Sequence, residues 1–389
     1  MKRNLIILLT LLLSFTTSFA LSYSGGSGTA EDPFLISTLA DLQELSNSGL
    51  DLWKNHHYKQ TNNINASATS TLDAGKGFTP IGNALDYFTG YYYGQDYTID
   101  GLYISRPTED YIGLFGRCLK ARIYNVNITN CHVEGHMYTG ALVGYMQNTS
   151  TVEDCSSNGL VEATHYYTGG LVGYADNSAI KRSYSTCTID ANINTGGLVG
   201  FLSGGSILYR SYSSGSVSGD NFTGGLCGQI STNCMLENSF STGDVSGNVF
   251  VGGFTSFTKA TSIDNCFCTG NVTGVAALGG FSGSSEGDIR NCFWNTETSG
   301  QTTSTSATGK TSAEMKTMST YTNASWDFVG ETANGNNDYW KIDAGGTINS
   351  GYPYLNGIGE TATPITLSSF TATAKAGVLE LAWETASET

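Results

Sequence analysis

The chain has 389 residues, among them 49 Gly and 5 Pro, and 13% of its residues are charged. Aromatic and aliphatic residues are too frequent, and charges too few, for an intrinsically disordered protein. The formal net charge of -15 argues against nucleic acid and anionic lipid as partners, because like charges repel.

Residues 1–20 are predicted to be a signal peptide. Lys2 and Arg3 provide the charged start, residues 5–15 are apolar, and small residues precede a cleavage site after Ala20. The apolar run is too short for a confident membrane span, and no later stretch is long and apolar enough to be one. No Cys follows the cleavage region, which argues against a lipoprotein anchor. We therefore expect a secreted or outer-surface protein with no integral membrane span after cleavage.

Residues 21–110 are predicted to form an N-terminal cap and irregular opening coils. Thr38 and Asp41 have the spacing of a capping box that opens a short helix. The apolar residues that would lie on one face of this helix are Leu39, Leu42 and Leu45. Such a helix would cover the otherwise open first coil.

Residues 111–293 contain a tandem repeat, most clearly as GALVGY, GGLVGY and GGLVGF. Its central apolar residues are Leu114, Leu142, Leu171, Leu198, Leu226, Phe254 and Phe281, at spacings of 28, 29, 27, 28, 28 and 27. A second apolar row is Ile123, Val152, Ile180, Ile207, Leu236, Ile263 and Ile289. A third is Val133, Val161, Ile189, Val217, Val245 and Val272. A constant period of this length indicates a solenoid.

The fold class predicted from these rows is an all-β parallel β-helix with three strands per coil and about 28 residues per coil. Right-handed winding is the default for parallel crossovers, and we expect a monomer. The Gly pairs before each anchor predict a corner that needs positive φ or close approach of coils. A stacked aromatic row is expected on the inside of the solenoid, formed by Tyr184, Tyr212, Phe240, Phe267 and Phe293.

Residues 294–358 leave the period and are expected to close the solenoid. Residues 313–318 suit a short helix, and residues 351–355 suit a closing segment. Residues 359–389 are predicted to be a linker and the start of a β-sandwich, which is too short to be stable alone. We therefore expect the natural chain to continue beyond Thr389.

The repeat resembles the GLUG repeat of bacterial surface proteins, which also occurs in the non-catalytic part of some IgA-specific metallopeptidases. This resemblance implies a module for adhesion or surface display. Residues 365–372 with 379–385 resemble the opening strands of a fibronectin type III-like module of Bacteroidetes proteins. That second resemblance implies type IX secretion.

Catalytic chemistry is not predicted for this chain. Glu153 and Asp154 lie in a different coil from Glu286 and Asp288, so we interpret both pairs as solvated surface charge. The zinc motif His-Glu-x-x-His is absent. We therefore expect a protein that is not an enzyme, with no catalytic residues and no cofactor.

Metal binding is likewise not predicted. His56 and His57 would point in opposite directions along a strand. His136 and His165 should lie at the same turn of adjacent coils, but two His without a carboxylate rarely bind a metal. Residues 334–338 lack the alternating acidic ligands of a calcium loop.

The nine Cys residues show no metal-site spacing. Cys266 and Cys292 occupy equivalent positions, so a disulfide between adjacent coils is one alternative. We favour buried thiols, because side-by-side strands fit disulfide torsions poorly. The residues at the same position in earlier coils are Ser183, Ser211 and Ser239.

The predicted function is adhesion or matrix binding at the surface of a Gram-negative bacterium. The ligand would be a glycan or a protein, bound along a lateral face rich in Tyr, Asn, Ser and Thr. One alternative is a carbohydrate-active β-helix enzyme, which three converging carboxylates would favour. The other is a non-catalytic spacer of a larger secreted enzyme.

Overall fold

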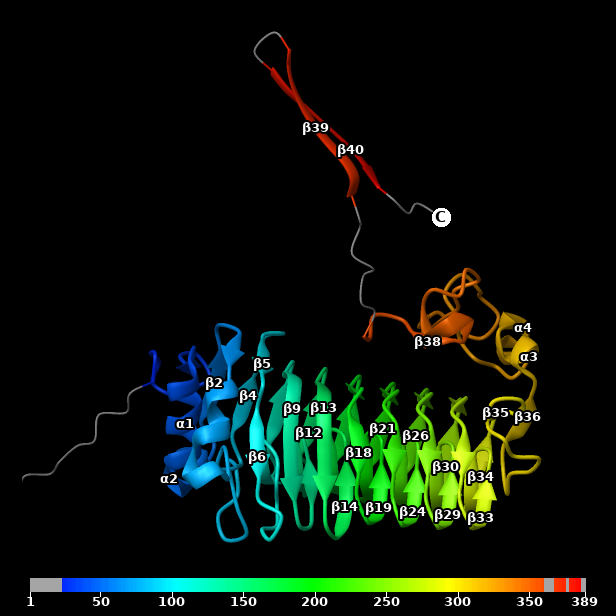
Figure 1. The fold of residues 1–389 in the computed structure, drawn as a ribbon, viewed down its shortest axis with the longest axis horizontal. Coiled ribbons are helices and arrows are strands. Elements are labelled where there is room, and N and C mark those ends of the chain that lie inside the picture. The colour runs from blue at the N-terminus through cyan, green and yellow to red at the C-terminus, as the bar shows by residue number, and fades with distance from the viewer. Residues whose placement is uncertain (1–22, 360–366, 376–377, 386–389) are drawn as a thin grey trace, which may run out of the picture.

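The computed structural model describes residues 23–359, together with the backbone of residues 367–375 and 378–385. It confirms the predicted fold class: a parallel β-solenoid of about 9 turns with about 28 residues per turn. Figure 1 shows the coils stacked along the long axis, from the helical N-terminal end to the last coil. The predicted signal peptide lies outside the described residues.

The solenoid wall consists of three sheets, which we name A, B and C. Sheet C has six strands: β10 (Thr139–Gly140), β14 (Tyr166–Gly169), β19 (Ile193–Gly196), β24 (Asn221–Gly224), β29 (Val249–Gly252) and β33 (Ala276–Gly279). Sheet A has fifteen: β1 (Phe34–Ile36), β2 (His57–Gln60), β4 (Tyr91–Tyr93), β7 (Phe115–Leu119), β8 (Arg122–Tyr124), β11 (Val143–Gln147), β12 (Thr151–Glu153), β15 (Val172–Asp176), β16 (Ala179–Lys181), β20 (Val199–Ser203), β21 (Ile207–Tyr209), β25 (Cys227–Ile230), β26 (Met235–Glu237), β30 (Thr255–Asp264) and β34 (Ser282–Arg290). Sheet B also has fifteen: β3 (Ile64–Asn65), β5 (Thr98–Asp100), β6 (Tyr103–Ser105), β9 (Asn127–Gly135), β13 (Ser156–Ala163), β17 (Tyr184–Ser185), β18 (Thr188–Asp190), β22 (Tyr212–Ser213), β23 (Val217–Ser218), β27 (Phe240–Ser241), β28 (Val245–Ser246), β31 (Phe267–Cys268), β32 (Val272–Thr273), β35 (Phe293–Asn295) and β36 (Thr308–Lys310).

A typical coil passes through sheets C, A and B in that order. The coil from β14 to β18 contains five short strands, where the sequence predicts three apolar strand centres. Two of the four breaks in this coil contain a residue with left-handed backbone: Asn177 (φ 45°) between β15 and β16, and Arg182 (φ 45°) between β16 and β17. A left-handed residue interrupts strand geometry, so each of these turns ends one strand before the next begins.

The apolar rows fill one continuous interior. The anchors of the first row are completely buried, as are most residues of the other two. One position of the second row was predicted wrongly: Leu208, not Ile207, pairs with Ile180 and Leu236. Ile207 is 39% exposed, whereas Leu208 is 0% exposed. Two neighbouring apolar residues satisfy the period almost equally well, and only the pairing register separates them.

The Gly pairs permit the close approach of successive coils. A Cβ atom on Gly197 would lie 2.2 Å from the carbonyl oxygen of Gly225, and one on Gly225 would lie 2.0 Å from that of Gly253. These glycines do not have positive φ. The left-handed residue of this corner comes earlier, for example at Asn194 (φ 57°). Of the two predicted reasons for the Gly pairs, close approach is therefore the one that applies.

The aromatic row of sheet B is stacked as predicted, but it lies on the outside of the solenoid. The rings of Tyr184 and Tyr212 are 4.8 Å apart, and those of Tyr212 and Phe240 are 4.7 Å apart. Ser183 and Ser185, on either side of Tyr184, are completely buried in the interior. Because side chains alternate along a strand, a buried Ser on each side places the ring outside.

A C-terminal segment, residues 311–358, covers the end of this outer row, and we call it the strap. Its elements are α3 (Ser312–Met315), α4 (Met318–Thr322), β37 (Trp340–Lys341), the 3-10 helix η3 (Asn349–Gly351) and β38 (Tyr354–Leu355). Two short helices thus replace the one expected over residues 313–318. The strap forms a second hydrophobic cluster with Phe240, Phe267 and Phe293, and Figure 1 shows it on one side of the last coils.

The N-terminal end carries the predicted cap. Helix α1 (Leu39–Asn47) begins with a capping box in which Thr38 and Asp41 exchange hydrogen bonds. Leu42 and Leu45 are completely buried against the first coils. The remaining elements of this end are α2 (Leu50–Trp53) and the 3-10 helices η1 (Ser67–Thr71) and η2 (Asp73–Gly75).

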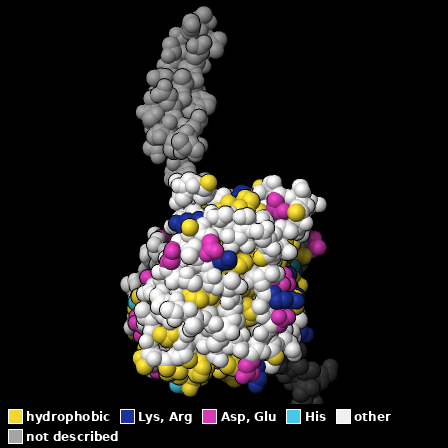
Figure 2. All heavy atoms as spheres, turned by 90° about the vertical axis from the view of Figure 1, so that its right-hand side faces the viewer, with side chains coloured by type: hydrophobic (Ala, Val, Ile, Leu, Met, Phe, Trp, Pro, Cys, Tyr) yellow, Lys and Arg dark blue, Asp and Glu magenta, His cyan; other side chains and the backbone are white. Residues whose placement is uncertain are grey.

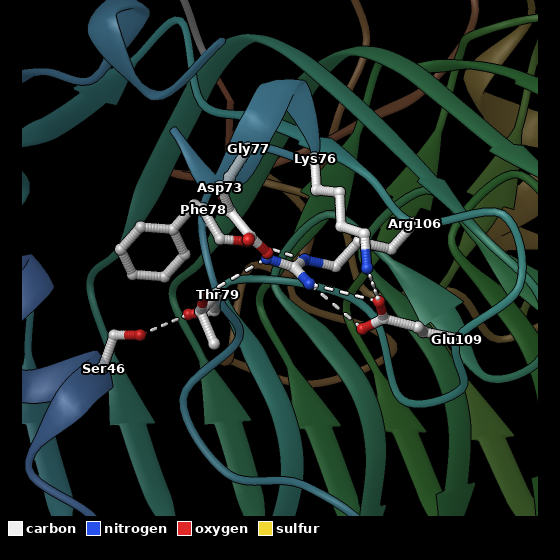
Figure 3. A network of polar contacts seen from close by, with 8 residues as sticks. All are labelled: Ser46, Asp73, Lys76, Gly77, Phe78, Thr79, Arg106 and Glu109. Atoms are coloured by element: carbon white, nitrogen blue, oxygen red, sulfur yellow. Dashed lines mark hydrogen bonds and ion pairs between the residues drawn. The ribbon is translucent and has the colours of Figure 1, made fainter. Parts of the chain in front are cut away.

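A buried arginine ties the cap loops to the solenoid (Figure 3). The side chain of Arg106 is 5% exposed and forms ion pairs with Asp73 (2.7 Å) and Glu109 (3.1 Å). Its guanidinium also donates to the carbonyl of Phe78 and to the hydroxyl of Thr79. A buried cation requires such partners. We therefore interpret this network as a structural contact that holds the cap loops against the solenoid.

Strands β39 (Leu367–Lys375) and β40 (Val378–Thr385) form an antiparallel hairpin. They coincide with most of the predicted β-sandwich start, while residues 365–366 lie outside the described residues. The hairpin alone does not test the fibronectin type III-like resemblance, which stays a prediction.

Candidate functional site: an aromatic corner and a lateral groove

Two columns of side chains run along the outside of the corner between sheets C and A. We call them together the aromatic corner. The first column is Tyr111, Tyr138, Tyr167, Asn194, Phe222 and Phe250. The second is Arg117, Tyr145, Tyr174, Phe201, Gln229 and Phe257, which are aligned by strand pairing. The corner follows the edge marked by β14, β19, β24, β29 and β33 in Figure 1.

The tyrosines of the corner stack along the axis and across the two columns. Ring centres are 4.9 Å apart for Tyr111 and Tyr138 and 5.2 Å apart for Tyr138 and Tyr167. In the second column, Tyr145 and Tyr174 are 4.8 Å apart. The columns meet at Tyr138 and Tyr145, whose centres are 5.3 Å apart. The arrangement is a double aromatic ladder with half-buried rings.

The first column holds its rings on an unfavourable backbone. Its aromatic members all have positive φ: Tyr111 (64°), Tyr138 (57°), Tyr167 (65°), Phe222 (59°) and Phe250 (56°). This conformation costs a bulky residue on the order of 1–3 kcal/mol, whereas Gly or Asn adopts it readily. Stacking returns about 0.5–1.5 kcal/mol per pair. The backbone conformation alone would therefore favour Gly or Asn at these positions. The aromatic residues are present although positive φ is unfavourable for them.

Polar side chains lie at both ends of the tyrosine-rich half of the corner. The guanidinium carbon of Arg117 lies 4.5 Å from the ring centre of Tyr87, 5.0 Å from that of Tyr111 and 5.3 Å from that of Tyr145. At the other end, Asn194 donates a hydrogen bond of 2.6 Å to Gln229. Beyond this pair the column residues are Phe. In Figure 2, which views the C-terminal end, hydrophobic side chains gather along the lower edge, where the corner reaches the last coil.

The hydroxyls of Tyr138, Tyr145 and Tyr167 remain protonated at neutral pH. Partial burial raises the pKa of Tyr138 to about 12, with the neighbouring Tyr111 and Tyr167 adding to the shift. Burial also raises the pKa of Tyr145 and Tyr167. Within residues 23–359, the hydroxyls of Tyr138, Tyr145 and Tyr167 have no hydrogen-bond partner, so they are available to a ligand. The hydroxyl of Tyr174, in contrast, contacts Ser203 at 2.9 Å.

These shifts predict alkaline destabilisation. Above the ordinary tyrosine pKa of about 10, the unfolded chain releases protons that folded Tyr138 retains until about pH 12. The contribution of these tyrosines to stability should therefore be constant below about pH 10 and fall as the pH rises further. Thermal unfolding measured between about pH 8 and 12 tests this. The Tyr138→Phe variant should lose less stability over this range than the unsubstituted chain, and an equal loss would contradict the assignment.

A second surface, which we call the lateral groove, runs along the outside of sheet B. It consists of two depressions of about 280 and 290 Å³ that share Asp190. Its central column is Glu134, Glu162, Asp190, Ser218, Ser246 and Thr273, aligned by register. His132 lies 3.0 Å from Glu162, and Ser105 donates to Glu134 at 2.6 Å.

This column contains three carboxylates that the sequence analysis did not single out. Glu134, Glu162 and Asp190 stand in three successive coils. Sequence reasoning compared carboxylates that are close in sequence and overlooked these three. Their spacing of 28 residues, equal to the coil period, is the signal that would have found them.

The carboxylates singled out from the sequence are not brought together. Glu153 and Asp154 both form ion pairs with Arg182, at 2.8 and 2.6 Å. Asp288 lies on the last strand of sheet A, 3.6 Å from Arg290. Ion-paired, partly solvated carboxylates of this kind are common surface features.

The histidines form contacts but no cluster of metal ligands. His57 stacks on Tyr91 at 4.2 Å. His136 and His165 lie on adjacent coils as predicted, with ring centres 5.1 Å apart, and His136 contacts Asp110 at 2.8 Å. No group of three or more His, Cys, Asp or Glu in the described part of the chain could hold a metal ion.

The other segments singled out from the sequence have structural roles. The backbone amides of Asn337 and Asp338 donate to the carboxylate of Asp327 and so fix a loop of the strap. Cys266 and Cys292 are buried free thiols, as favoured, and they donate to backbone carbonyls at 3.2 and 3.0 Å. Burial raises the pKa of Cys266 well above its ordinary value, so this thiol stays protonated.

These features define a class of protein: a capped parallel β-solenoid with a strapped outer face, a stacked tyrosine edge and a polar lateral groove. No family model matches the chain. The chain is 39% identical over 142 residues to halomucin of Haloquadratum walsbyi, which is 35% of this chain and 2% of halomucin. It is also 39% identical over 95 residues to a provisionally named Gly-rich membrane protein of Evansella cellulosilytica, 24% of this chain and 10% of that protein.

Two solved structures share the fold. A provisionally named immunoglobulin A1 protease from Bacteroides ovatus superposes with a TM-score of 0.60 at 17% identity, over 86% of this chain and 95% of that one. An IgA1 protease superposes with a TM-score of 0.50 at 17% identity, over 66% of this chain and 21% of that one. A likeness at this identity shows the fold alone.

The expectation that the chain is not an enzyme must be corrected. Both structural neighbours carry the name of a protease, which contradicts that expectation. The GLUG resemblance is not confirmed, because no family model matches. In the part of the chain that the structure describes, no helix is long and apolar enough to span a bilayer.

Proposed function

We propose that the chain is an exported or surface-displayed repeat protein that binds an extracellular glycan or protein along the aromatic corner. The predicted signal peptide and the GLUG resemblance support export and display. The similarity to halomucin and to a Gly-rich membrane protein supports the same location. Because the chain spans 2% and 10% of these two relatives, their whole activities are not transferred to it.

The observation that carries this proposal is the column of rings on left-handed backbone. Tyr111, Tyr138 and Tyr167 keep aromatic side chains where Asn194 shows that a smaller residue suffices. Strained conformations tend to concentrate at functional sites. Tyr is also a favoured contact residue, because it offers apolar area and a hydroxyl at a low cost in entropy.

The experiment is binding of the purified chain to immobilised glycans and extracellular matrix proteins. The double variant Tyr138→Ala/Tyr167→Ala should lose binding at least about tenfold, as expected for residues at the centre of an interface. The matched control is Tyr124→Ala, which removes a tyrosine from the outer face of sheet A away from the corner. Equal losses in both variants, or none in the double variant, would refute the proposal.

A second candidate function is hydrolysis of an extended substrate in the lateral groove. The aligned Glu134, Glu162 and Asp190 favour it, because pairs of carboxylates serve acid–base hydrolysis. The protease names of the two structural neighbours make IgA1 a substrate to test beside polysaccharides. Cleavage that disappears in Glu162→Gln but persists in Glu286→Gln would establish this function. Absence of cleavage of either substrate class would exclude it for those substrates.

A further inference from the structure

We infer that the tyrosine-rich half of the aromatic corner binds an extended, uncharged polysaccharide that lies parallel to the solenoid axis. The inference rests on the proposed function and names the ligand class of that same site. The recognising groups would be the hydroxyls of Tyr138, Tyr145 and Tyr167. Each coil of the corner would contact about one sugar unit.

The first argument is the repeat distance. Tyr138 and Tyr167 are 5.2 Å apart, and Tyr145 and Tyr174 are 4.8 Å apart, so equivalent groups recur at the spacing of the coils. This spacing is close to the rise of one unit in an extended β-linked polysaccharide. A straight glycan chain on this edge therefore meets chemically equivalent groups at every unit. A compact protein ligand has no such period.

The second argument is the exposed chemistry. The ring planes of Tyr111 and Tyr138 differ by 2° and those of Tyr138 and Tyr167 by 20°, so each ring covers the faces of its neighbours. A ligand therefore meets ring edges and hydroxyls rather than an open aromatic face. The hydroxyls of Tyr138, Tyr145 and Tyr167 have no hydrogen-bond partner within residues 23–359. Each can both donate and accept, which matches the hydroxyl groups of a sugar.

The third argument is charge, and it favours a neutral polymer. Asp110 and Asp176 lie near enough to raise the pKa of Tyr138 and Tyr145, respectively. The cation at this edge, Arg117, is held among three tyrosine rings and donates to the carbonyl of Ala84. With a net charge of -15, the protein repels a polyanion at long range.

The fourth argument sets the length of the ligand. Tyrosine hydroxyls occupy three successive coils, represented by Tyr111, Tyr138 and Tyr167. The next coil carries Asn194, and the following positions are Phe222 and Phe250, which have no hydroxyl. Affinity should therefore rise with each sugar unit up to about three and change little beyond that.

The test measures calorimetric binding of β-1,4-linked glucose and N-acetylglucosamine oligomers of increasing length, with polygalacturonate as the acidic comparison. The triple variant Tyr138→Phe/Tyr145→Phe/Tyr167→Phe keeps every ring and removes the hydroxyls. We expect at least about a tenfold loss of affinity, because several hydrogen bonds to the ligand disappear together. The melting temperature should stay unchanged, since the stacking remains. Tyr184→Phe, in the outer row of sheet B, is the matched control and should bind normally.

Three results would overturn the inference: no neutral oligomer binds, the triple variant binds as well as the unsubstituted chain, or polygalacturonate binds more tightly. The outcome is distinguishable from failure of the proposed function. If Tyr138→Ala/Tyr167→Ala abolishes binding to a matrix protein while no oligosaccharide binds, the corner is a protein-binding surface and only the inference fails. If no ligand depends on the corner, both fail.

Discussion

Replacing Leu208 by Asp should prevent the central coils from forming, whereas replacing its neighbour Ile207 by Asp should have little effect. Leu208 is completely buried and pairs with Ile180 and Leu236 in the coils on either side. Removing a buried Leu side chain alone costs about 2–5 kcal/mol. An unpaired buried carboxylate adds several kcal/mol more, which approaches the whole stability of a typical domain at about 5–15 kcal/mol.

Ile207 is the matched control for Leu208, because it is adjacent, equally large and 39% exposed. Its replacement should cost about 1 kcal/mol or less, mainly through lost strand propensity. Urea unfolding followed by circular dichroism measures both effects. A larger loss for Ile207→Asp would show that the register of β21 is shifted by one residue, which would turn every side chain of that strand to the opposite face.

The period of the sequence predicts the interior of the solenoid because stacking requires an apolar residue at the same interior position in every coil. A coil can bury its apolar side chains only if the next coil presents matching ones. Replacing Val217 by a polar residue would therefore lower the stability of the contacts with the coils on both sides. The rows through Leu171 and Val161 were therefore readable from spacing alone. The error at Ile207 arose where two apolar residues are adjacent and the pattern allows either register.

The outer features were harder to predict because they depend on which way a side chain points. Tyr184 repeats with the same period as the core, and periodicity alone cannot tell an inner column from an outer one. The buried serines at 183 and 185 settle its direction. The same limit concealed the corner: Tyr145 and Tyr174 end the repeat motif and pair in register, but the period does not show that they point outward and stack on Tyr138 and Tyr167.

The strap could not be predicted in detail, because its contacts join residues far apart in sequence. Trp340 donates to the side chain of Asn238 at 3.0 Å, and Arg210 donates to the carbonyl of Asn356 at 2.7 Å. Nothing in the local sequence of residues 311–358 marks the outer row of sheet B as their partner. Once the row is known to lie outside, however, its stacked Phe rings require a cover, since exposed apolar patches of that size are uncommon.

Replacing Trp326 by Ala should therefore release the strap while leaving the solenoid folded. Trp326 is completely buried, and its ring lies 4.7 Å from Tyr321 and 4.6 Å from Trp340. Its indole also donates to the carbonyl of Asn291 at 2.9 Å, which joins the strap to the last coils. Deleting a buried Trp side chain costs about 3–5 kcal/mol, enough to unfold a segment of this size locally.

Hydrogen exchange measured by mass spectrometry separates this result from global unfolding. Amides of β37 and β38 should lose protection, while those of β15 and β20 keep theirs, because the strap and the solenoid interior are separate hydrophobic clusters. Trp326→Phe preserves an aromatic ring and should retain most of the protection. If Trp326→Ala unfolds the coils as well, the strap is part of one cooperative unit with them. If protection of β37 is unchanged, Trp326 does not hold the strap in place.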